Sequence, residues 1–340
     1  MPPKPSKKTA KKAEPVEEEM EVDEEVVESA EDEEVDDEED VSSESEDEIM
    51  PEADDAMEKM NFDFEAVPLN SNDVDSLVNL LTQIFLRANI DCEAIAKAMI
   101  AMSPLGCVYK AAEDNVDEDS EAVVYGVLSA VELGGVEQYQ VDIANAILNR
   151  ARKNTTKEIV KSFEEIFSPI GDKKKNYFLV NERMLHFPAQ IAAPAFASLK
   201  DDLSEEGYLN NLNKIILISK LRVADAPAST ATAPAVPSAP LAPGQKKKKI
   251  GKAEKKRLAA AAIAEAEVLF DNPEEELLFK NGGTISPTYF QYNVEGDVER
   301  DSKFHRVVKD GVTYRPYRRV TILTKDDFLG YVELLQNAGF

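Results

Sequence analysis

The chain has 340 residues and a formal net charge of −27, from 66 acidic and 39 basic residues. About 26 of the acidic residues lie between Glu14 and Glu58, where no basic residue occurs, so the rest of the chain is close to neutral (about −1). The two cysteines, Cys92 and Cys107, exclude a disulfide framework, and two histidines argue against a histidine-based metal site. No apolar run approaches the length of a membrane span, so we expect neither a membrane protein nor an exported one.

Residues 1–60 are predicted to be a disordered tail, basic over residues 1–12 and acidic over residues 14–58. Neither part has periodic apolar residues that could bury enough surface to offset chain entropy. Within the acidic tract, Ser42, Ser43 and Ser45 adjoin carboxylates, a context that acid-directed kinases favour. We expect these serines to be phosphorylated, which would deepen the negative charge.

Folded structure is predicted to begin near residue 61. In chain order, the patterns predict a strand over Phe62–Ala66, helices over Asp73–Phe85 and Asp91–Met102, strands over Gly106–Ala111 and Ala122–Leu133, a helix after Gly134-Gly135, a helix from Thr155, and strands over Tyr177–Val180 and Lys214–Leu221. Between the last two strands, Pro194 would lack a hydrogen bond inside a helix. The helix there is therefore expected to kink at Pro194 or to begin at it.

An insertion is predicted at about residues 224–257, where an Ala/Pro-rich segment runs into a lysine-rich one and neither can join a packed core. Beyond it we expect a helix over Leu258–Phe270, a helix opening on Asn272-Pro273-Glu274, strands over Thr284–Val294 and Val320–Leu323, and a final helix from Thr324. Strands and helices alternate throughout. This order predicts one α/β domain over residues 61–340, with a central mixed sheet flanked by helices.

Three polar residues, Asn181, Glu182 and Arg183, follow the apolar run Tyr177–Val180 and are predicted to lie at a strand end. Strand ends carry many ligand contacts, but charges at such a corner also serve structural hydrogen bonds. Because no nucleophile or cofactor motif accompanies them, we expect a locked corner at the rigid edge of a partner-binding surface.

A second candidate surface interleaves aromatic and cationic side chains before a predicted strand. Its members are Arg315, Tyr317, Arg318 and Arg319, with Tyr314 beside them. Such a patch can stack on bases or grip the carboxylates of a partner. The alternative is an edge strand whose arginines deter pairing between sheets.

A cluster of lysines is predicted to be a nuclear localisation signal read by an import receptor. It consists of Lys246, Lys247, Lys248, Lys249, Lys252, Lys255, Lys256 and Arg257. A solvated charge run is the alternative. Contact with nucleic-acid phosphates is opposed by the acidic tail, which would repel nucleic acid and compete for the same lysines, so direct nucleic-acid binding is not expected.

No catalytic, cofactor-binding or metal-binding residues are predicted. The sequence has no P-loop, no GxSxG elbow and no cluster of residues that would activate a nucleophile. Gly134-Gly135 could begin an anion-binding turn, but two glycines equally suit an ordinary strand-to-helix turn, and Glu137 brings a carboxylate there. A disordered polyanion, by contrast, attracts basic proteins. The composition therefore favours a protein that binds basic clients.

Seven sequence blocks resemble the BCCIP family and follow one another in the family's order. They are MNFDFEAVPLNSNDVDSLVNLLTQIF, LGCVYK, VVYGVLSAVEL, LVNERMLHFPAQIAAP, ILISK, VLFDNPEEELLF and RRVTILTKDDF, and they span nearly all of residues 60–340. The resemblance implies a fold related to the N-acetyltransferase superfamily that binds acetyl-CoA. The cofactor turn of that superfamily, [QR]xxGx[GA], is absent from this sequence.

The resemblance also implies a nuclear protein without enzymatic activity, with shuttling to the cytoplasm as a further expectation. Implied partners are a large-subunit ribosomal protein that the chain would chaperone and export, a recombination factor and a cyclin-dependent kinase inhibitor. We therefore expect a nuclear adaptor or chaperone that needs no cofactor. The alternative function is that of a divergent N-acetyltransferase that binds acetyl-CoA through an atypical turn.

Overall fold

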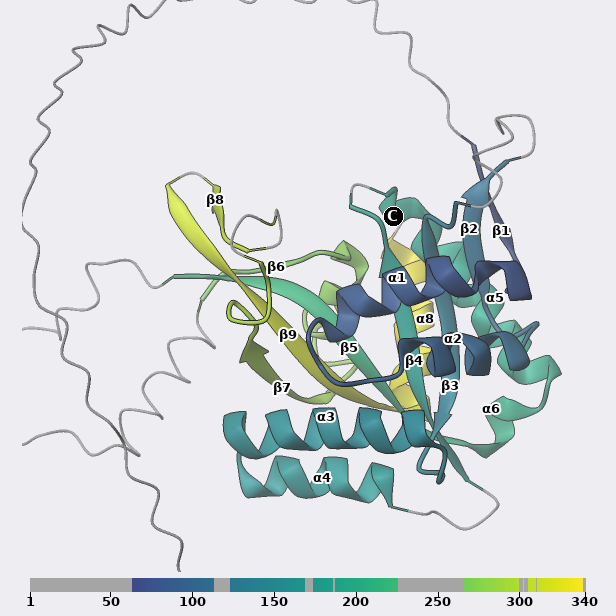
Figure 1. The fold of residues 1–340 in the computed structure, drawn as a ribbon, viewed down its shortest axis with the longest axis horizontal. Coiled ribbons are helices and arrows are strands. Elements are labelled where there is room, and N and C mark those ends of the chain that lie inside the picture. Colours follow the sequence, from purple (N-terminus) through teal and green to yellow (C-terminus); the bar gives the residue numbers. More distant parts are fainter. Residues whose placement is uncertain are drawn as a thin grey trace, which may run out of the picture. The chain divides into compact units, whose positions relative to one another are not determined.

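A mixed β-sheet is the centre of the fold in this computed structural model, which describes residues 63–112, 123–168, 174–185, 187–225, 266–299, 302, 305–309 and 311–338 (Figure 1). Within these residues the strands are β1 (Phe64–Val67), β2 (Cys107–Ala111), β3 (Gly126–Leu133), β4 (Lys175–Arg183), β5 (Leu212–Ala224), β6 (Val268–Phe270), β7 (Thr288–Asn293), β8 (Val307–Lys309) and β9 (Val312–Thr324). Their order is β1-β2-β3-β4-β5-β9-β7, with β6 pairing β5 and β8 pairing β9. Only β4 and β5 run parallel to each other within this sheet.

Helices cover both faces of the sheet. They are α1 (Val74–Phe85), α2 (Cys92–Ala101), α3 (Gln138–Asn154), α4 (Lys157–Phe167), α5 (Ala192–Glu205), α6 (Tyr208–Asn211) and α8 (Lys325–Ala338), with short 3₁₀ helices η1 (Ser71–Asp73), η3 (Ala189–Ile191) and η5 (Pro273–Leu278). One hydrophobic core lies between the sheet and α1–α4, and a second lies between the sheet and α5, α8 and η5. The predicted mixed sheet flanked by helices is therefore confirmed.

The one-sided apolar stripe predicted for α1 packs on the sheet. Leu77 and Leu81 are fully buried, because residues four apart share one face of a helix. The helix α5 begins at Ala192, so Pro194 falls in its first turn, where a missing N–H leaves no helical hydrogen bond unmade. The helix therefore does not begin at Pro194.

Two predicted elements differ from the structure. The end of the helix predicted over Leu258–Phe270 is instead the strand β6, and the start of that prediction lies outside the described residues. The strand predicted over Val320–Leu323 is much longer, and β9 lies between β5 and β7/β8. It is an inner strand, so the edge-strand interpretation of its arginines is wrong.

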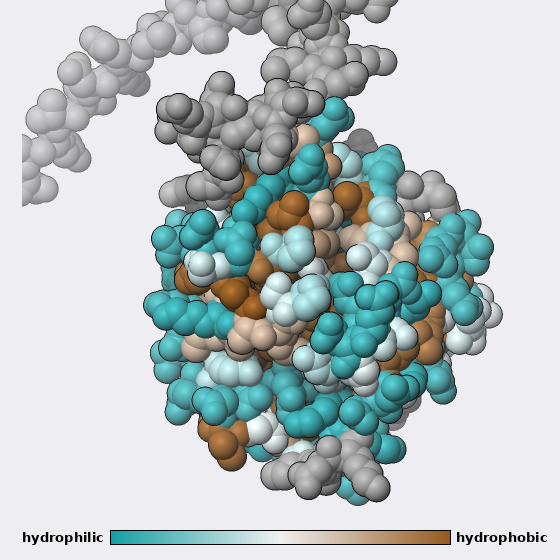
Figure 2. Space-filling view, turned by 90° about the vertical axis from the view of Figure 1, so that its right-hand side faces the viewer, coloured by the Kyte–Doolittle hydropathy of each residue, from teal (hydrophilic) through white to brown (hydrophobic). Residues whose placement is uncertain are grey.

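The side of the domain formed by β1, β2 and α5 is seen face on in Figure 2, where hydrophobic residues appear between hydrophilic ones. The strand β1 is the last in the strand order, and within the described part of the chain no further strand pairs with its outer side.

Candidate functional site

The parallel strands β4 and β5 diverge at their carboxyl ends, and the segment after the insertion fills the space between them. The two strands pair over Lys175–Leu179 and Leu212–Leu217. Beyond that point β5 pairs with β9 on one side and with β6 on the other. The segment Val268–Leu278, which we call the β6–η5 segment, therefore reaches between β5 and the end of β4 (Figure 1).

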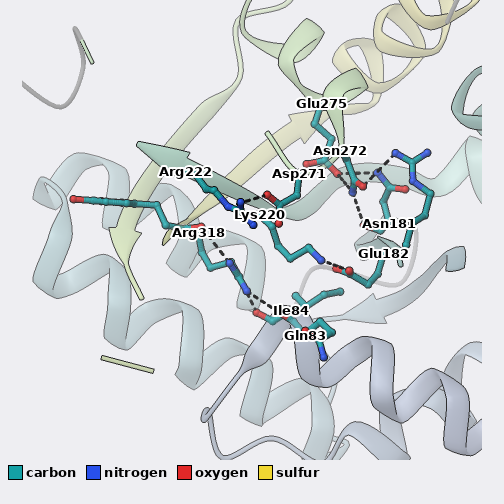
Figure 3. A network of polar contacts seen from close by, with 12 residues as sticks. Gln83, Ile84, Asn181, Glu182, Lys220, Arg222, Asp271, Asn272, Glu275 and Arg318 are labelled. Carbon is teal, nitrogen blue, oxygen red and sulfur yellow. Dashed lines mark hydrogen bonds and ion pairs between the residues drawn. The ribbon is translucent and has the colours of Figure 1, made fainter. Parts of the chain in front are cut away.

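A set of seven buried side chains, which we call the polar cluster, joins these elements. Its members are Asn181, Glu182 and Arg183 on β4, Lys220 on β5, and Asn272, Glu274 and Glu275 at η5. Figure 3 labels Asn181, Glu182, Lys220, Asn272 and Glu275. Their exposed fractions run from 0% to 7%, so the cluster is closed to solvent. Because buried polar groups are costly unless they are paired, the contacts within the cluster decide its role.

On the face of the sheet toward α5 and α8, Arg183 pairs with Glu274. One guanidinium nitrogen, Nη2, donates to both carboxylate oxygens of Glu274 at 2.7 Å and to Asn272 Oδ1 at 3.2 Å. The side chains of the ion pair are 3% and 0% exposed. Breaking one member of such a pair strands an uncompensated charge, so it locks β4 to η5.

Two carboxamides complete this face. Asn181 Nδ2 donates to Glu275 Oε1 at 2.8 Å and to Glu274 Oε1 at 3.2 Å. Asn272 Nδ2 donates to the same Glu275 oxygen at 3.0 Å and to the carbonyl oxygen of Asn181 at 3.1 Å. Asn272 precedes Pro273 at the start of η5. The first turn of η5 carries three acidic residues, and negative side chains there interact favourably with the helix dipole.

Successive side chains of a strand alternate between faces, so Glu182 points to the opposite side of the sheet, toward α1. Its carboxylate forms an ion pair with Lys220 of β5. Burial raises the pKa of the Glu182 carboxyl, while Lys220 and then Arg318 act against that rise. Beside this pair, Arg222 lies 3.6 Å from Asp271, whose backbone N–H donates to the Lys220 carbonyl at 3.0 Å.

The pKa of Glu275 in the polar cluster is strongly raised. Burial, and then the adjacent charge of Glu274, raise the pKa of its carboxyl to about 7, although Ser219, Asn272 and Asn181 act in the opposite direction. Burial and the same two carboxylates also hold the pKa of Tyr331 in α8 well above its ordinary value. Arg183 bonds Glu274, whereas Glu275 accepts from the amides of Asn181 and Asn272, so this arrangement can hold a proton on Glu275 near neutral pH.

The arginines of the predicted aromatic and cationic patch lie within β9, and each contacts a different part of the domain. Arg318 donates to the carbonyl oxygens of Gln83 at 2.7 Å and Ile84 at 3.3 Å, and so caps the end of α1 (Figure 3). Arg315 pairs with Asp225 at 2.6 Å and with Glu295 at 3.2 Å.

Arg319 is enclosed by aromatic rings. Its guanidinium lies 5.2 Å, 4.3 Å and 4.7 Å from the ring centres of Phe270, Phe279 and Tyr289, and it donates twice to Gln291 Oε1. Desolvation by this surrounding lowers the pKa of Arg319. The contacts attach β6 and the residue after η5 to β9.

These positions correct the first predicted partner surface and part of the second. Asn181, Glu182 and Arg183 are only 1% to 6% exposed, so they form the predicted locked corner but do not face a partner. Arg318 and Arg319 are 5% and 7% exposed and have internal partners, so they form no open surface either. Tyr317 and Arg315 are half-buried, and their role in partner binding stays a prediction.

The remaining predicted sites fall into two groups. The localisation cluster from Lys246 to Arg257 and the serines Ser42, Ser43 and Ser45 lie outside the described residues. The turn at Gly134-Gly135 is described, and the N–H groups that follow it are capped from within the chain. The Glu137 side chain accepts from the backbone of Gln140, and the Gln140 side chain accepts from the backbone of Glu137. The ordinary strand-to-helix turn is therefore the better description.

The sequence interpretation missed Lys220, Glu274 and Glu275. Lys220 was visible as the charged residue inside the apolar run of β5, and a buried strand tolerates such a residue when it is paired. The sequence placed the two glutamates only at the start of a helix, and no local signal distinguishes them from Glu276, which is partly exposed.

Among the described residues, no group of three or more His, Cys, Asp or Glu side chains could hold a metal ion. In the same residues no helix is both long enough and apolar enough to cross a membrane.

Comparison with known proteins identifies relatives over most of the chain. It is 41% identical over 281 residues to the protein BCCIP homolog of Caenorhabditis elegans, covering 81% of this chain and 78% of the nematode protein. It is 30% identical over 162 residues to the BRCA2 and CDKN1A-interacting protein of Bos taurus, covering 45% of this chain and 51% of the bovine protein.

Two solved structures are similar at low scores. The crystal structure of BCP1 from Saccharomyces cerevisiae has a TM-score of 0.44 at 16% identity, covering 81% of this chain and 87% of that one. An aminoglycoside 6'-N-acetyltransferase from Enterococcus faecium has a TM-score of 0.28 at 10% identity, covering 77% and 97%. The assignment therefore rests on sequence, and the BCCIP family model matches residues 59–278. The chain belongs to the BCCIP family.

Proposed function

We propose that this protein is a non-enzymatic nuclear adaptor and chaperone that binds basic client proteins. Members of the family carry names of interacting proteins, and the bovine relative is named for interaction with BRCA2 and CDKN1A. A recombination factor and a cyclin-dependent kinase inhibitor are accordingly proposed partners of this chain. A large-subunit ribosomal protein, chaperoned and exported, is proposed as a further client.

The strongest support for this function is that the β6–η5 segment fills the space between the carboxyl ends of β4 and β5. In α/β sheets, small ligands bind where strands part at their carboxyl ends. Here that place holds the Arg183–Glu274 and Glu182–Lys220 ion pairs and the β6–η5 segment. A cofactor would have to displace buried, paired charges, which supports binding to proteins over catalysis.

Capture of clients is assigned to the acidic tract of residues 14–58. A polyanion attracts basic proteins over about a Debye length, roughly 8 Å at physiological salt, and competes with nucleic acid for them. Phosphorylation of Ser42, Ser43 and Ser45 would strengthen that attraction. Because charge alone captures without specificity, the folded domain supplies the recognising surface. Entry to the nucleus is assigned to the lysine cluster, Lys246 to Arg257.

A binding assay with purified proteins tests this function. The full chain, a variant lacking residues 14–58, and a matched variant with every Asp and Glu of that tract changed to Asn and Gln are compared on an immobilised basic ribosomal protein. We expect binding by the full chain, and a large loss of binding in both variants and at high salt. Equal binding by all three chains at both salt concentrations would contradict the polyanion mechanism.

A thermal-shift assay tests the enzymatic alternative. A ligand that binds the native state raises the melting temperature. We expect acetyl-CoA at millimolar concentration to leave the melting temperature of the full chain unchanged. An increase that saturates with cofactor concentration would favour an acetyltransferase.

A further inference from the structure

The sheet ends at β1, and the hydrogen-bond pattern shows which backbone groups of β1 point outward. The backbone N–H of Ala112 donates to the Asp63 carbonyl at 2.9 Å, so residues 63 and 112 form a hydrogen-bonded pair. Such pairs alternate along an antiparallel ladder, so Glu65 and Val67 also bond to β2. The N–H and C=O groups of Ala66 therefore point away from the sheet, and an edge of this kind can accept another strand.

A groove lies beside this edge, on the face of the sheet covered by α5. It has a volume of about 370 Å³, with Ala66, Val67 and Pro68 at the end of β1 on one side. The opposite side is one stripe of α5 and the turn before it, formed by Ile191, Pro194, Ala195 and Ser198. Apolar residues dominate the lining, and Figure 2 shows hydrophobic residues on this side of the domain.

Charge on the opposite face of β1 is negative. Side chains of a strand alternate, so Asp63 and Glu65 project away from the face that carries Ala66. Both carboxylates are exposed. The neighbouring lysine, Lys110 of β2, is already paired with the buried Asp73 at 2.7 Å. The α5 stripe also continues to Asp202, whose carboxylate accepts from the Gly106 N–H at 2.9 Å.

We propose that the outer edge of β1 binds an extended segment of a basic partner protein as an added strand. Its apolar side chains would alternate with lysine or arginine. The apolar side chains stand beside Phe64 and Ala66 and enter the groove, and the cations stand beside Asp63 and Glu65. Main-chain hydrogen bonds to Ala66 supply affinity, and the alternation supplies specificity. This inference rests on the proposed function, because it names the surface that recognises the client.

A peptide-binding experiment tests the edge directly. A fluorescent peptide of alternating valine and lysine is titrated with the full chain, and its anisotropy is followed. Peptides of alternating valine and glutamate, and of alternating serine and lysine, are the charge and groove controls. We expect binding of the valine–lysine peptide, with affinity at least about tenfold above both controls.

Two variants separate the edge from the groove. Ala66→Pro removes an outward N–H and leaves the bonds to β2 intact, while Ala66→Ser keeps that N–H as a matched control. We expect about a tenfold loss of affinity in A66P and no change in A66S. Ser198→Trp fills the groove from an exposed position on α5 and should weaken binding without altering the edge. This variant keeps the test decisive if A66P fails to fold.

Several outcomes would overturn the proposal. Unchanged affinity in folded A66P and S198W would do so, as would equal binding of the valine–glutamate peptide. A dimer of the full chain that A66P converts to monomers would assign the edge to a second copy. Binding that appears only after removal of residues 1–59 would assign it to the chain's own N-terminal segment. If the basic ribosomal protein still binds through the acidic tract, the proposed function survives and only this inference fails.

Discussion

Glu275→Gln is expected to stabilise the protein at neutral and alkaline pH. Glu275 is fully buried beside the Glu274–Arg183 pair, and burial with the neighbouring charge raises its pKa from 4.5 to about 7. Glutamine has the shape of the protonated acid. It can still accept at Oε1 from Asn181 and Asn272, and its amide N–H₂ can donate toward Ser219 Oγ, which lacks a well-formed hydrogen bond among the described residues.

The sign and size follow from linkage. Between pH 4.5 and 7 the unfolded chain ionises this carboxyl while the native protein keeps its proton, so the free energy of unfolding falls as pH rises. The fall is complete above the folded pKa of about 7. At about 1.4 kcal/mol for each unit of pKa, the loss is about 3 kcal/mol. The uncharged amide introduced by E275Q has no such loss, so the variant should match the native protein near pH 4.5 and exceed it by about 3 kcal/mol at pH 8.

Urea unfolding from pH 4.5 to 8, followed by far-ultraviolet circular dichroism, measures this difference. Glu276→Gln is the matched control, because Glu276 lies in the same helix η5 in a partly exposed ion pair with Lys280 and should change stability by less than about 1 kcal/mol. A difference between E275Q and the native protein that does not depend on pH would refute the reasoning, as would a variant less stable than the native protein at pH 8.

Two other substitutions test the buried contacts. Arg183→Ala leaves the Glu274 carboxylate buried without its partner and should lower the free energy of unfolding by about 3–5 kcal/mol. Arg152→Ala is the control: Arg152 forms an exposed pair with Glu164, and its loss should lower the free energy of unfolding by no more than about 1 kcal/mol. Equal losses of stability in urea unfolding would refute the locked corner. Arg318→Gln removes the charged cap from the end of α1 and should lower the free energy of unfolding by about 2 kcal/mol. Relative to the native protein, amide hydrogen exchange should accelerate more at that end of α1 than at its start. An equal acceleration along the whole helix would argue against capping.

The sequence was sufficient to predict the elements whose pattern is local. The stripe of α1 and the apolar runs of β4 and β5 depend on residues close together in the chain, and so does the proline that begins η5. The contacts that determine the site join residues that are far apart in the sequence. Arg183 meets Glu274 across 91 residues, and Arg318 meets Gln83 across 235. A charge satisfied at such a distance has the same local pattern as a solvated one, which is why Asn181, Glu182 and Arg183 were predicted to lie at the edge of a partner-binding surface.

The pairing of β5 with β6 has a consequence for how this family can change. Val223 lies opposite Val268, and the Ala224 N–H donates to the Glu267 carbonyl at 2.9 Å. The chain therefore leaves the sheet and returns to it at one point, with the intervening residues closed by a two-stranded stem. The entropy of closing a chain segment grows slowly with its length, by only about 0.6 kcal/mol for each doubling. A reporter or affinity tag inserted between residues 226 and 245, ahead of the lysine cluster, should therefore cost the fold little stability.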